Sequence, residues 1–186
     1  MVQIWDNLDY EIILLLIRGE RHLRDISKAL DASHSTVLRR LNGLASENAL
    51  GYKTEGRNKV FFIKKNIEGR NYVYNAERYK LNRLIKEYPT LAVAIEDMLK
   101  KTDERLIILF GSYAKFSAKE DSDIDVYVET SGKKAKEAIE SVNSKIRVKT
   151  GDFYPGSLLI KEIIKNHVII RGVEDFYEKT RFFDKH

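Results

Sequence analysis

The sequence predicts an α+β protein in which a helix-rich module is joined by further helices to a small mixed β-sheet. Three observations predict it. Apolar residues recur at helical spacing over residues 8–45 and a hairpin pattern follows, two further helical patterns fill residues 75–98, and strand patterns then alternate with helical ones. We therefore expect a helix-turn-helix module at residues 1–65, a helical connector at 66–101 and a mixed sheet flanked by helices at 102–186.

Length and composition limit the class of protein. The 186 residues have room for two small domains, and the absence of cysteine excludes a disulfide framework and thiolate metal sites. No apolar run reaches the roughly 18 to 20 residues of a membrane span, and the N-terminus lacks a secretion-signal pattern. We expect a cytoplasmic protein without membrane contact. The net charge of +5 is small beside 33 basic and 28 acidic residues, so charge alone does not establish nucleic-acid binding.

The first module has the pattern of three short helices. A first helix is predicted from Leu8 to Leu16, a second from Leu23 to Leu30, and a third from Val37 to Ala45 after a tight turn. Ser33 or Ser35 is placed to cap the third helix by accepting hydrogen bonds from its free N–H groups. The second and third helices form a helix-turn-helix.

A hairpin follows, with strands at Leu50 to Thr54 and Lys59 to Ile63. The order of three helices and a hairpin resembles winged-helix DNA-binding domains over about Leu8 to Lys64. The resemblance implies that the third helix enters the major groove of double-stranded DNA and that the hairpin, or wing, touches an adjacent backbone. The residues then expected to face DNA are His34, Ser35, Thr36, Arg39, Arg40, Lys53, Arg57 and Lys59. The alternative is a protein-interaction or dimerisation module whose charges are merely solvated.

The connector has two helical patterns. The first runs from Asn75 to Tyr88 and is ended by Pro89, and Thr90 is expected to cap the second, which runs through Met98. Winged-helix proteins often dimerise through helices beside the wing, so we expect any homodimer contact here.

The second module is organised around two strands with polar residues at their ends. An apolar run from Leu106 to Phe110 leads into Gly111-Ser112, and ten residues later Asp123-Ile124-Asp125 opens a second apolar run. Because side chains alternate along a strand, Asp123 and Asp125 share a face. Two carboxylates that close repel each other unless a cation lies between them, and their hard oxygen ligands suit Mg²⁺ or Mn²⁺. Glycine allows close backbone approach, and Ser112 can donate to phosphate oxygens.

The spacing Gly111-Ser112, ten residues, Asp123-x-Asp125 resembles the signature of minimal nucleotidyltransferases in the DNA polymerase beta superfamily, from about Arg105 to Gly172. The resemblance implies transfer of NMP, with AMP expected, from an NTP to an acceptor hydroxyl with Mg²⁺ or Mn²⁺. The metal ligands would be Asp123 and Asp125, and the nucleotide-binding residues Gly111, Ser112, Lys115 and Lys119. It also implies an antitoxin-like setting, in which the acceptor is a separate partner protein. The alternative is a hairpin whose Asp residues cap a turn.

The remaining pattern completes a sheet of order β-β-α-β-α-β. A helix is predicted from Lys133 to Val142, a strand from Ile146 to Thr150, a helix capped by Ser157, and a closing strand from His167 to Gly172. The charged and aromatic segment after it suggests a last short helix.

One departure from the family pattern bears on catalysis. The resemblance implies a third carboxylate on a neighbouring strand, completing the metal site and acting on the attacking hydroxyl, but Arg147 stands near its expected place. Asp152 at the end of that strand is the best substitute, and we assign it a catalytic role beside Asp123 and Asp125. The competing hypothesis is a DNA-binding transcriptional regulator whose nucleotidyltransferase fold senses nucleotide without turnover.

Overall fold

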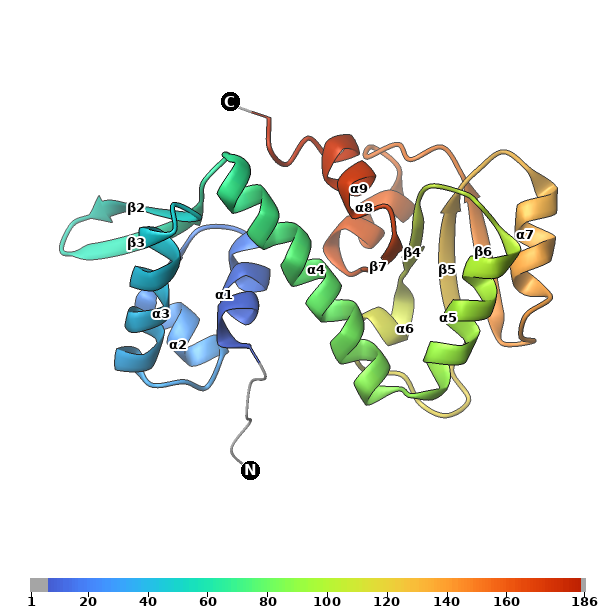
Figure 1. Cartoon of the computed structure of the whole chain (residues 1–186), viewed down its shortest axis with the longest axis horizontal. Helices are drawn as coiled ribbons and strands as arrows, with labels where there is room; N and C mark the ends of the chain where they lie inside the picture. Colours follow the sequence, from blue (N-terminus) through green and yellow to red (C-terminus); the bar gives the residue numbers. More distant parts are fainter. Residues whose placement is uncertain (1–6, 185–186) are drawn as a thin grey trace. The chain divides into compact units, whose positions relative to one another are not determined.

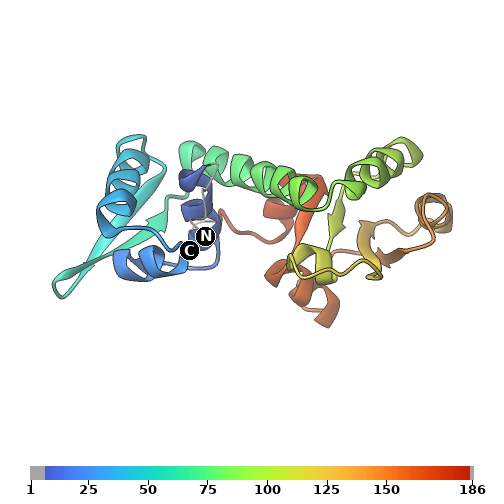
Figure 2. The ribbon, with the colours of Figure 1, turned by 90° about the horizontal axis from the view of Figure 1, so that it is seen from below.

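The computed structural model describes residues 7–184. Residues 1–6 of the predicted first module and residues 185–186 of the last lie outside the described residues. The chain is a mixed α+β protein that divides into two compact units, Met1–Tyr79 with Phe183–His186, and Lys80–Phe182 (Figure 1). One continuous helix, α4 (Ile67–Glu87), contains the point of division (Figure 2).

The first unit has winged helix-turn-helix architecture. Its elements before α4 are α1 (Leu8–Ile17), β1 (Arg21–His22), α2 (Leu23–Ala29), α3 (His34–Ser46), β2 (Leu50–Glu55) and β3 (Asn58–Ile63). The three strands form an antiparallel sheet of order β1-β3-β2. The three helices and the hairpin were predicted. Strand β1 was not, because two residues carry no periodic signal.

Local sequence explains the helix-turn-helix. The Ser33 hydroxyl caps α3 by accepting a hydrogen bond from the Thr36 N–H at 3.2 Å. The apolar stripes of the three helices meet in one core, where Ile12, Ile26 and Val37 are completely buried. The exposed side of α3 is mostly polar, with Leu38 as an exposed apolar residue.

Helix α4 begins eight residues before the predicted start. Asn66 precedes it and accepts a hydrogen bond from the Gly69 N–H at 2.9 Å, which is a capping arrangement. The early turns lack the apolar stripe that predicts a helix. They are held instead by tyrosine hydroxyls: Tyr72 donates to Glu47, and Tyr79 donates to Glu11 at 2.8 Å. These tyrosines therefore pack within the first unit.

The second unit contains α5 (Thr90–Lys101), β4 (Ile107–Leu109), α6 (Gly111–Ala114), β5 (Ile124–Glu129), α7 (Lys133–Glu140), β6 (Ile146–Gly151), α8 (Leu158–Lys165), β7 (Val168–Arg171) and α9 (Val173–Lys179). The predicted order of strands and helices is confirmed. The strands form one sheet of order β6-β5-β4-β7, in which only β5 and β6 run parallel (Figure 1). One detail was wrong: Thr90 is the first residue of α5, after an N-cap at Pro89 that supplies no side-chain hydrogen bond.

The two faces of the sheet differ in chemistry. On one face, alternate residues of β5 and β6, among them Val126 and Val148, are buried in a core with Met98 of α5 and Ile139 of α7. The residues between them point the other way, so Asp125 of β5 lies on the opposite face. That face carries the candidate site.

Candidate functional site

Gly111 and Asp125 bring the two halves of the motif together. The Phe110 N–H donates to the Asp125 carbonyl at 2.9 Å, and Gly111 then opens α6 at φ +71°. A Cβ built on Gly111 would lie 2.2 Å from Asp125 Oδ2. Glycine suits this backbone best, because any other residue would be strained by the positive φ and would force the Asp125 carboxylate to move.

Ser112 follows Gly111 in α6 and is half-buried. The two lysines of the loop are placed differently from each other. Lys115 Nζ lies 2.9 Å from Glu162 Oε1 of α8, so its charge is already paired. Lys119 is exposed, and its backbone N–H donates to Ser122 Oγ at 2.8 Å, which shapes the loop before β5. Of the two lysines predicted to neutralise phosphate, Lys119 is the less constrained.

The electrostatics of the carboxylate pair favour a cation. Burial raises the pKa of Asp125, and the nearby charge of Asp123 raises it further, while Lys149 and Arg147 act in the opposite direction. The raised pKa means that the ionised form is disfavoured where it stands. A cation bound between Asp123 and Asp125 would relieve that cost.

Arg147 occupies the position opposite Asp125. In the parallel pairing of β5 and β6 the two residues are direct partners, so their side chains lie on the same face of the sheet. Arg147 Nη2 lies 3.3 Å from Asp123 Oδ1, and Nη1 donates to the carbonyls of Ser144 at 2.6 Å and Ile146 at 3.1 Å. A guanidinium therefore faces the carboxylate pair where the family resemblance implies a third carboxylate.

Asp152 does not join this site, so its predicted role there was wrong. The paired strands end with Glu129 opposite Gly151, and Asp152 follows. Since Asp125 comes four residues before Glu129, Gly151 lies roughly 13 Å further along the strands, and Asp152 lies beyond it. The acidic side chain of Asp152 and its position next to the strand predict the catalytic role. The parallel register, however, places the residue at the far end of the sheet.

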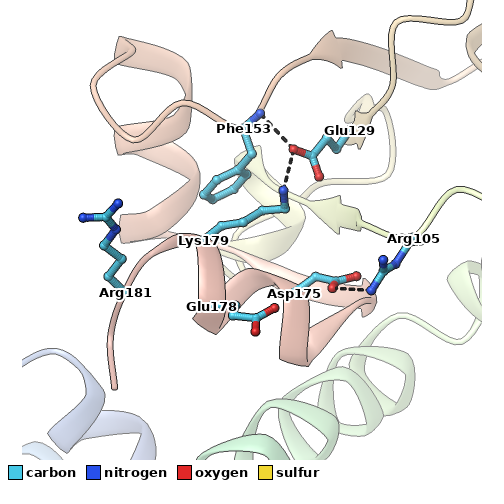
Figure 3. A pocket seen from close by; sticks show the side chains of 7 residues that line it. All are labelled: Arg105, Glu129, Phe153, Asp175, Glu178, Lys179 and Arg181. Carbon is cyan, nitrogen blue, oxygen red and sulfur yellow. Dashed lines mark hydrogen bonds and ion pairs between the residues drawn. The ribbon is translucent and has the colours of Figure 1, made fainter. Parts of the chain in front are cut away.

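A pocket of about 490 Å³ lies at that far end, where Asp152 precedes Phe153 (Figure 3). It is lined by Arg105, Glu129, Phe153, Asp175, Glu178, Lys179 and Arg181. The Arg105 and Asp175 side chains pair at 2.9 Å, and Glu129 Oε1 accepts from Lys179 at 2.9 Å and from the Phe153 N–H at 3.2 Å. Sequence reasoning missed this pocket because its residues come from separate segments with no shared motif.

In the first unit, the predicted DNA-facing residues fall into two groups. His34, Ser35 and Arg39 are exposed on α3, and Arg57 and Lys59 are exposed on the wing. Thr36 is half-buried, and its hydroxyl accepts from Ser33 at 2.9 Å, so it serves the cap of α3.

Two of the residues predicted to contact DNA form ion pairs with acidic neighbours instead. Arg40 Nη1 lies 3.5 Å from Asp9 Oδ2. Lys53 is paired with both Glu20 and Glu55. Their charges are partly compensated within the unit, which reduces what they offer to a polyanion.

A pocket of about 450 Å³ lies between α2, α3 and the wing. His34, Arg57 and Lys59, which are expected to face DNA, line it, and Arg24 at the start of α2 and Asn58 at the start of β3 join them. No sequence pattern singles out Arg24 or Asn58, because only the fold brings the start of α2 beside the wing. The lining also includes the apolar side chains of Leu23, Leu38 and Phe61 and the acidic Asp25, so the pocket is of mixed character.

Comparison with known proteins bears on the second unit. Residues 94–173 match the family model described as Polymerase beta, Nucleotidyltransferase. The matched segment includes β4 to β7 and all the candidate residues of the carboxylate site. The second unit therefore carries a nucleotidyltransferase-type domain, which supports a nucleotidyltransferase-type function.

Two further comparisons concern the whole chain. The crystal structure of the adhesin competence repressor (AdcR) from Streptococcus pyogenes is similar at a TM-score of 0.37 and 18% identity, covering 53% of this chain and 79% of that chain. No curated protein matches the sequence.

The side chains of the nucleotidyltransferase-type domain fit one divalent cation but not a metal pair. Within residues 7–184, no group of three His, Cys, Asp or Glu side chains gathers to hold a metal. Asp123 and Asp125 supply two carboxylates, and the third position holds Arg147. Two hard oxygen donors suit one Mg²⁺ that arrives with a triphosphate, because magnesium commonly takes one or two carboxylates plus phosphate oxygens.

Among the described helices, none is both long and apolar enough to cross a membrane.

Proposed function

We propose that the protein is a DNA-binding regulator whose nucleotidyltransferase-type domain binds a nucleoside triphosphate together with one divalent cation. The observation that carries the nucleotide site is the contact between Gly111 and Asp125, where a Cβ would lie 2.2 Å from the carboxylate. This close approach puts the backbone N–H groups beside Gly111 next to the carboxylate, so phosphate and cation would be held side by side. The match of residues 94–173 to the nucleotidyltransferase family supports the same site.

Each residue has a role in this binding. The Ser112 hydroxyl and the backbone N–H groups beside Gly111 donate to phosphate oxygens. Asp123 and Asp125 hold Mg²⁺ or Mn²⁺, which neutralises part of the triphosphate charge when bound. Lys119 is the loop lysine available for the remaining charge. ATP is the nucleotide to test first.

The second candidate function is transfer of NMP, with AMP expected, to an acceptor hydroxyl on a separate partner protein. The juxtaposition of Gly111 with Asp125 favours it, because a transferase needs the same triphosphate site. Arg147 argues against rapid transfer. A guanidinium stays protonated at physiological pH, so it cannot accept a proton from the attacking hydroxyl as a carboxylate can. Nucleotide sensing with little turnover is therefore the better-supported function.

The DNA half of the proposal rests on α3 and the wing. Arg39 and His34 are exposed on α3, and Arg57 and Lys59 extend from the wing. Recognition helices of this kind read base edges in the major groove while basic wing residues bind phosphates. Arg24 adds a cation beside the wing. Binding to double-stranded DNA as a homodimer through the helices next to the wing would place two such units on paired half-sites.

The test combines binding and turnover in one preparation. We expect ATP with Mg²⁺ to raise the melting temperature of the full-length chain. With α-labelled ATP and the product of the neighbouring gene as acceptor, little label should become attached to protein. Rapid, stoichiometric labelling would instead assign the transferase function, and the absence of any thermal shift with all four NTPs would remove the nucleotide site.

A further inference from the structure

Strand β6 carries two exposed basic side chains on the face that bears Asp125. Arg147 and Lys149 are two residues apart, and both are exposed. Arg147 is the direct partner of Asp125, and Lys149 is the partner of Tyr127. The two cations share strand, face and exposure, and both lower the pKa of Asp125, but the guanidinium of Arg147 also contacts Asp123.

Arg147 is fixed in place, although about half of its side chain is exposed. Its Nη1 donates to two backbone carbonyls, those of Ser144 and Ile146, at 2.6 and 3.1 Å. Its Nη2 lies 3.3 Å from Asp123 Oδ1, with side-chain exposures of 52% for Arg147 and 51% for Asp123. The carbonyl contacts orient the guanidinium, so the positive charge stands beside Asp123 and is not spread over a mobile chain.

We propose that Arg147 acts as a built-in cation that limits the carboxylate site to a single divalent ion. This inference rests on the proposed nucleotide site. A second divalent ion would need a further carboxylate and would have to share Asp123 with a guanidinium. Like charges at that separation repel, and the ligand position that would compensate is the one Arg147 occupies.

The register predicts how the restriction can be lifted. Neighbouring strands lie about 4.8 Å apart, so an aspartate at position 147 would stand beside Asp125 on the same face. Arg147→Asp would replace the guanidinium with a carboxylate that points at the same spot. Lys149→Asp makes the same change of charge two residues along the strand, opposite Tyr127 and without the contact to Asp123, so it controls for the loss of a positive charge near Asp125.

The experiment counts bound Mn²⁺ by electron paramagnetic resonance of the free ion, with full-length wild type, Arg147→Asp, Arg147→Gln and Lys149→Asp. Each is titrated with Mn²⁺ alone and with Mn²⁺ plus an ATP analogue that has a methylene between the α- and β-phosphates. With the analogue, we expect one Mn²⁺ per chain for wild type and Lys149→Asp, and two for Arg147→Asp. With Mn²⁺ alone, Arg147→Asp should bind at least about tenfold more tightly than Lys149→Asp.

Several results would overturn the inference. Two Mn²⁺ ions per wild-type chain would show that Arg147 does not restrict the site. Equal Mn²⁺ binding by Arg147→Asp and Lys149→Asp would show that only net charge matters. Arg147→Gln removes the charge without adding a carboxylate, so it should bind Mn²⁺ more tightly than wild type, and it decides the matter if Arg147→Asp does not fold. If the analogue does not change Mn²⁺ binding by the wild type, the proposed nucleotide site is contradicted. The titrations with Mn²⁺ alone would still test the role of Arg147.

Discussion

The carboxylate of Asp125 occupies the space where a side chain at position 111 would begin. A Cβ on Gly111 would lie 2.2 Å from Asp125 Oδ2. The strand end and the acidic strand meet this closely because the residue at their contact is glycine. Since this contact creates the proposed phosphate position, it can be tested apart from the carboxylates themselves.

Gly111→Ala should weaken both stability and nucleotide binding. The positive φ of +71° costs an alanine about 1 to 2 kcal/mol, and displacing Asp125 adds to that. We expect a lower melting temperature and no shift with ATP and Mg²⁺. Gly151→Ala is the control, because Gly151 also has positive φ but no atom within 4 Å of its built Cβ. It should lower the melting temperature and keep the nucleotide shift. A retained shift in Gly111→Ala would contradict the role of the contact.

Asp152→Ala should leave both properties almost unchanged. The residue is exposed and lies beyond Gly151, at the end of β6 remote from Asp125. Surface substitutions of this kind stay within about 0.5 kcal/mol of wild type. The melting temperature with and without ATP and Mg²⁺ measures this directly. Loss of the nucleotide shift in Asp152→Ala would mean that the strand register is wrong or that the nucleotide binds elsewhere.

Arg39→Ala should weaken DNA binding more than Arg40→Ala. Both residues are exposed on α3, but Arg40 is paired with Asp9. If Arg39 neutralises one phosphate, its loss should reduce the slope of log affinity against log salt by about 0.9. Fluorescence anisotropy with duplex DNA at several salt concentrations gives both numbers. Similar losses of DNA affinity in the two variants would show that the pairing of Arg40 with Asp9 does not affect DNA binding. If the wild type does not bind DNA even at low salt, the first unit is instead a protein-interaction module.

Tyr72 should make the first unit sensitive to alkaline pH. Burial, followed by the hydrogen bond to Glu47, raises the pKa of Tyr72 from 10.0 to about 12. Because the folded state holds this proton more tightly, the stabilisation is fully present below pH 10 and is lost as the pH rises towards 12. Urea unfolding of wild type and Tyr72→Phe should give a free-energy difference that narrows above pH 10. A difference independent of pH would show that the hydroxyl does not titrate with folding.

The sequence predicted the elements of the carboxylate site but not every neighbour of that site. The fixed gap between Gly111 and Asp123 and the alternation of Asp123 and Asp125 are local features, and local geometry carries them into the structure. The error at Asp152 came from the strand register, which depends on how far α7 carries the chain before β6 begins. A register is set by the packing of the whole sheet and is not written in the strand itself.

Ion pairs were the other feature that the sequence could not supply. Lys115 was predicted to be a phosphate ligand, but Glu162 lies 47 positions away along the chain and pairs with it. Arg40 and Asp9 are related in the same way. Exposed charges choose partners by tertiary proximity, and single-sequence patterns hold no information on that distance.

The most direct test of the nucleotide site is calorimetric titration of ATP with Mg²⁺ into wild type and into the variant that combines Asp123→Asn with Asp125→Asn. The substitutions keep size and polarity but remove the two negative charges that hold the cation. We expect saturable binding of one ATP per wild-type chain, its loss from wild type when EDTA replaces Mg²⁺, and no measurable binding by the double variant, although that variant should melt at a higher temperature without ligand. Undiminished ATP binding by the double variant would place the nucleotide elsewhere and contradict the proposed function.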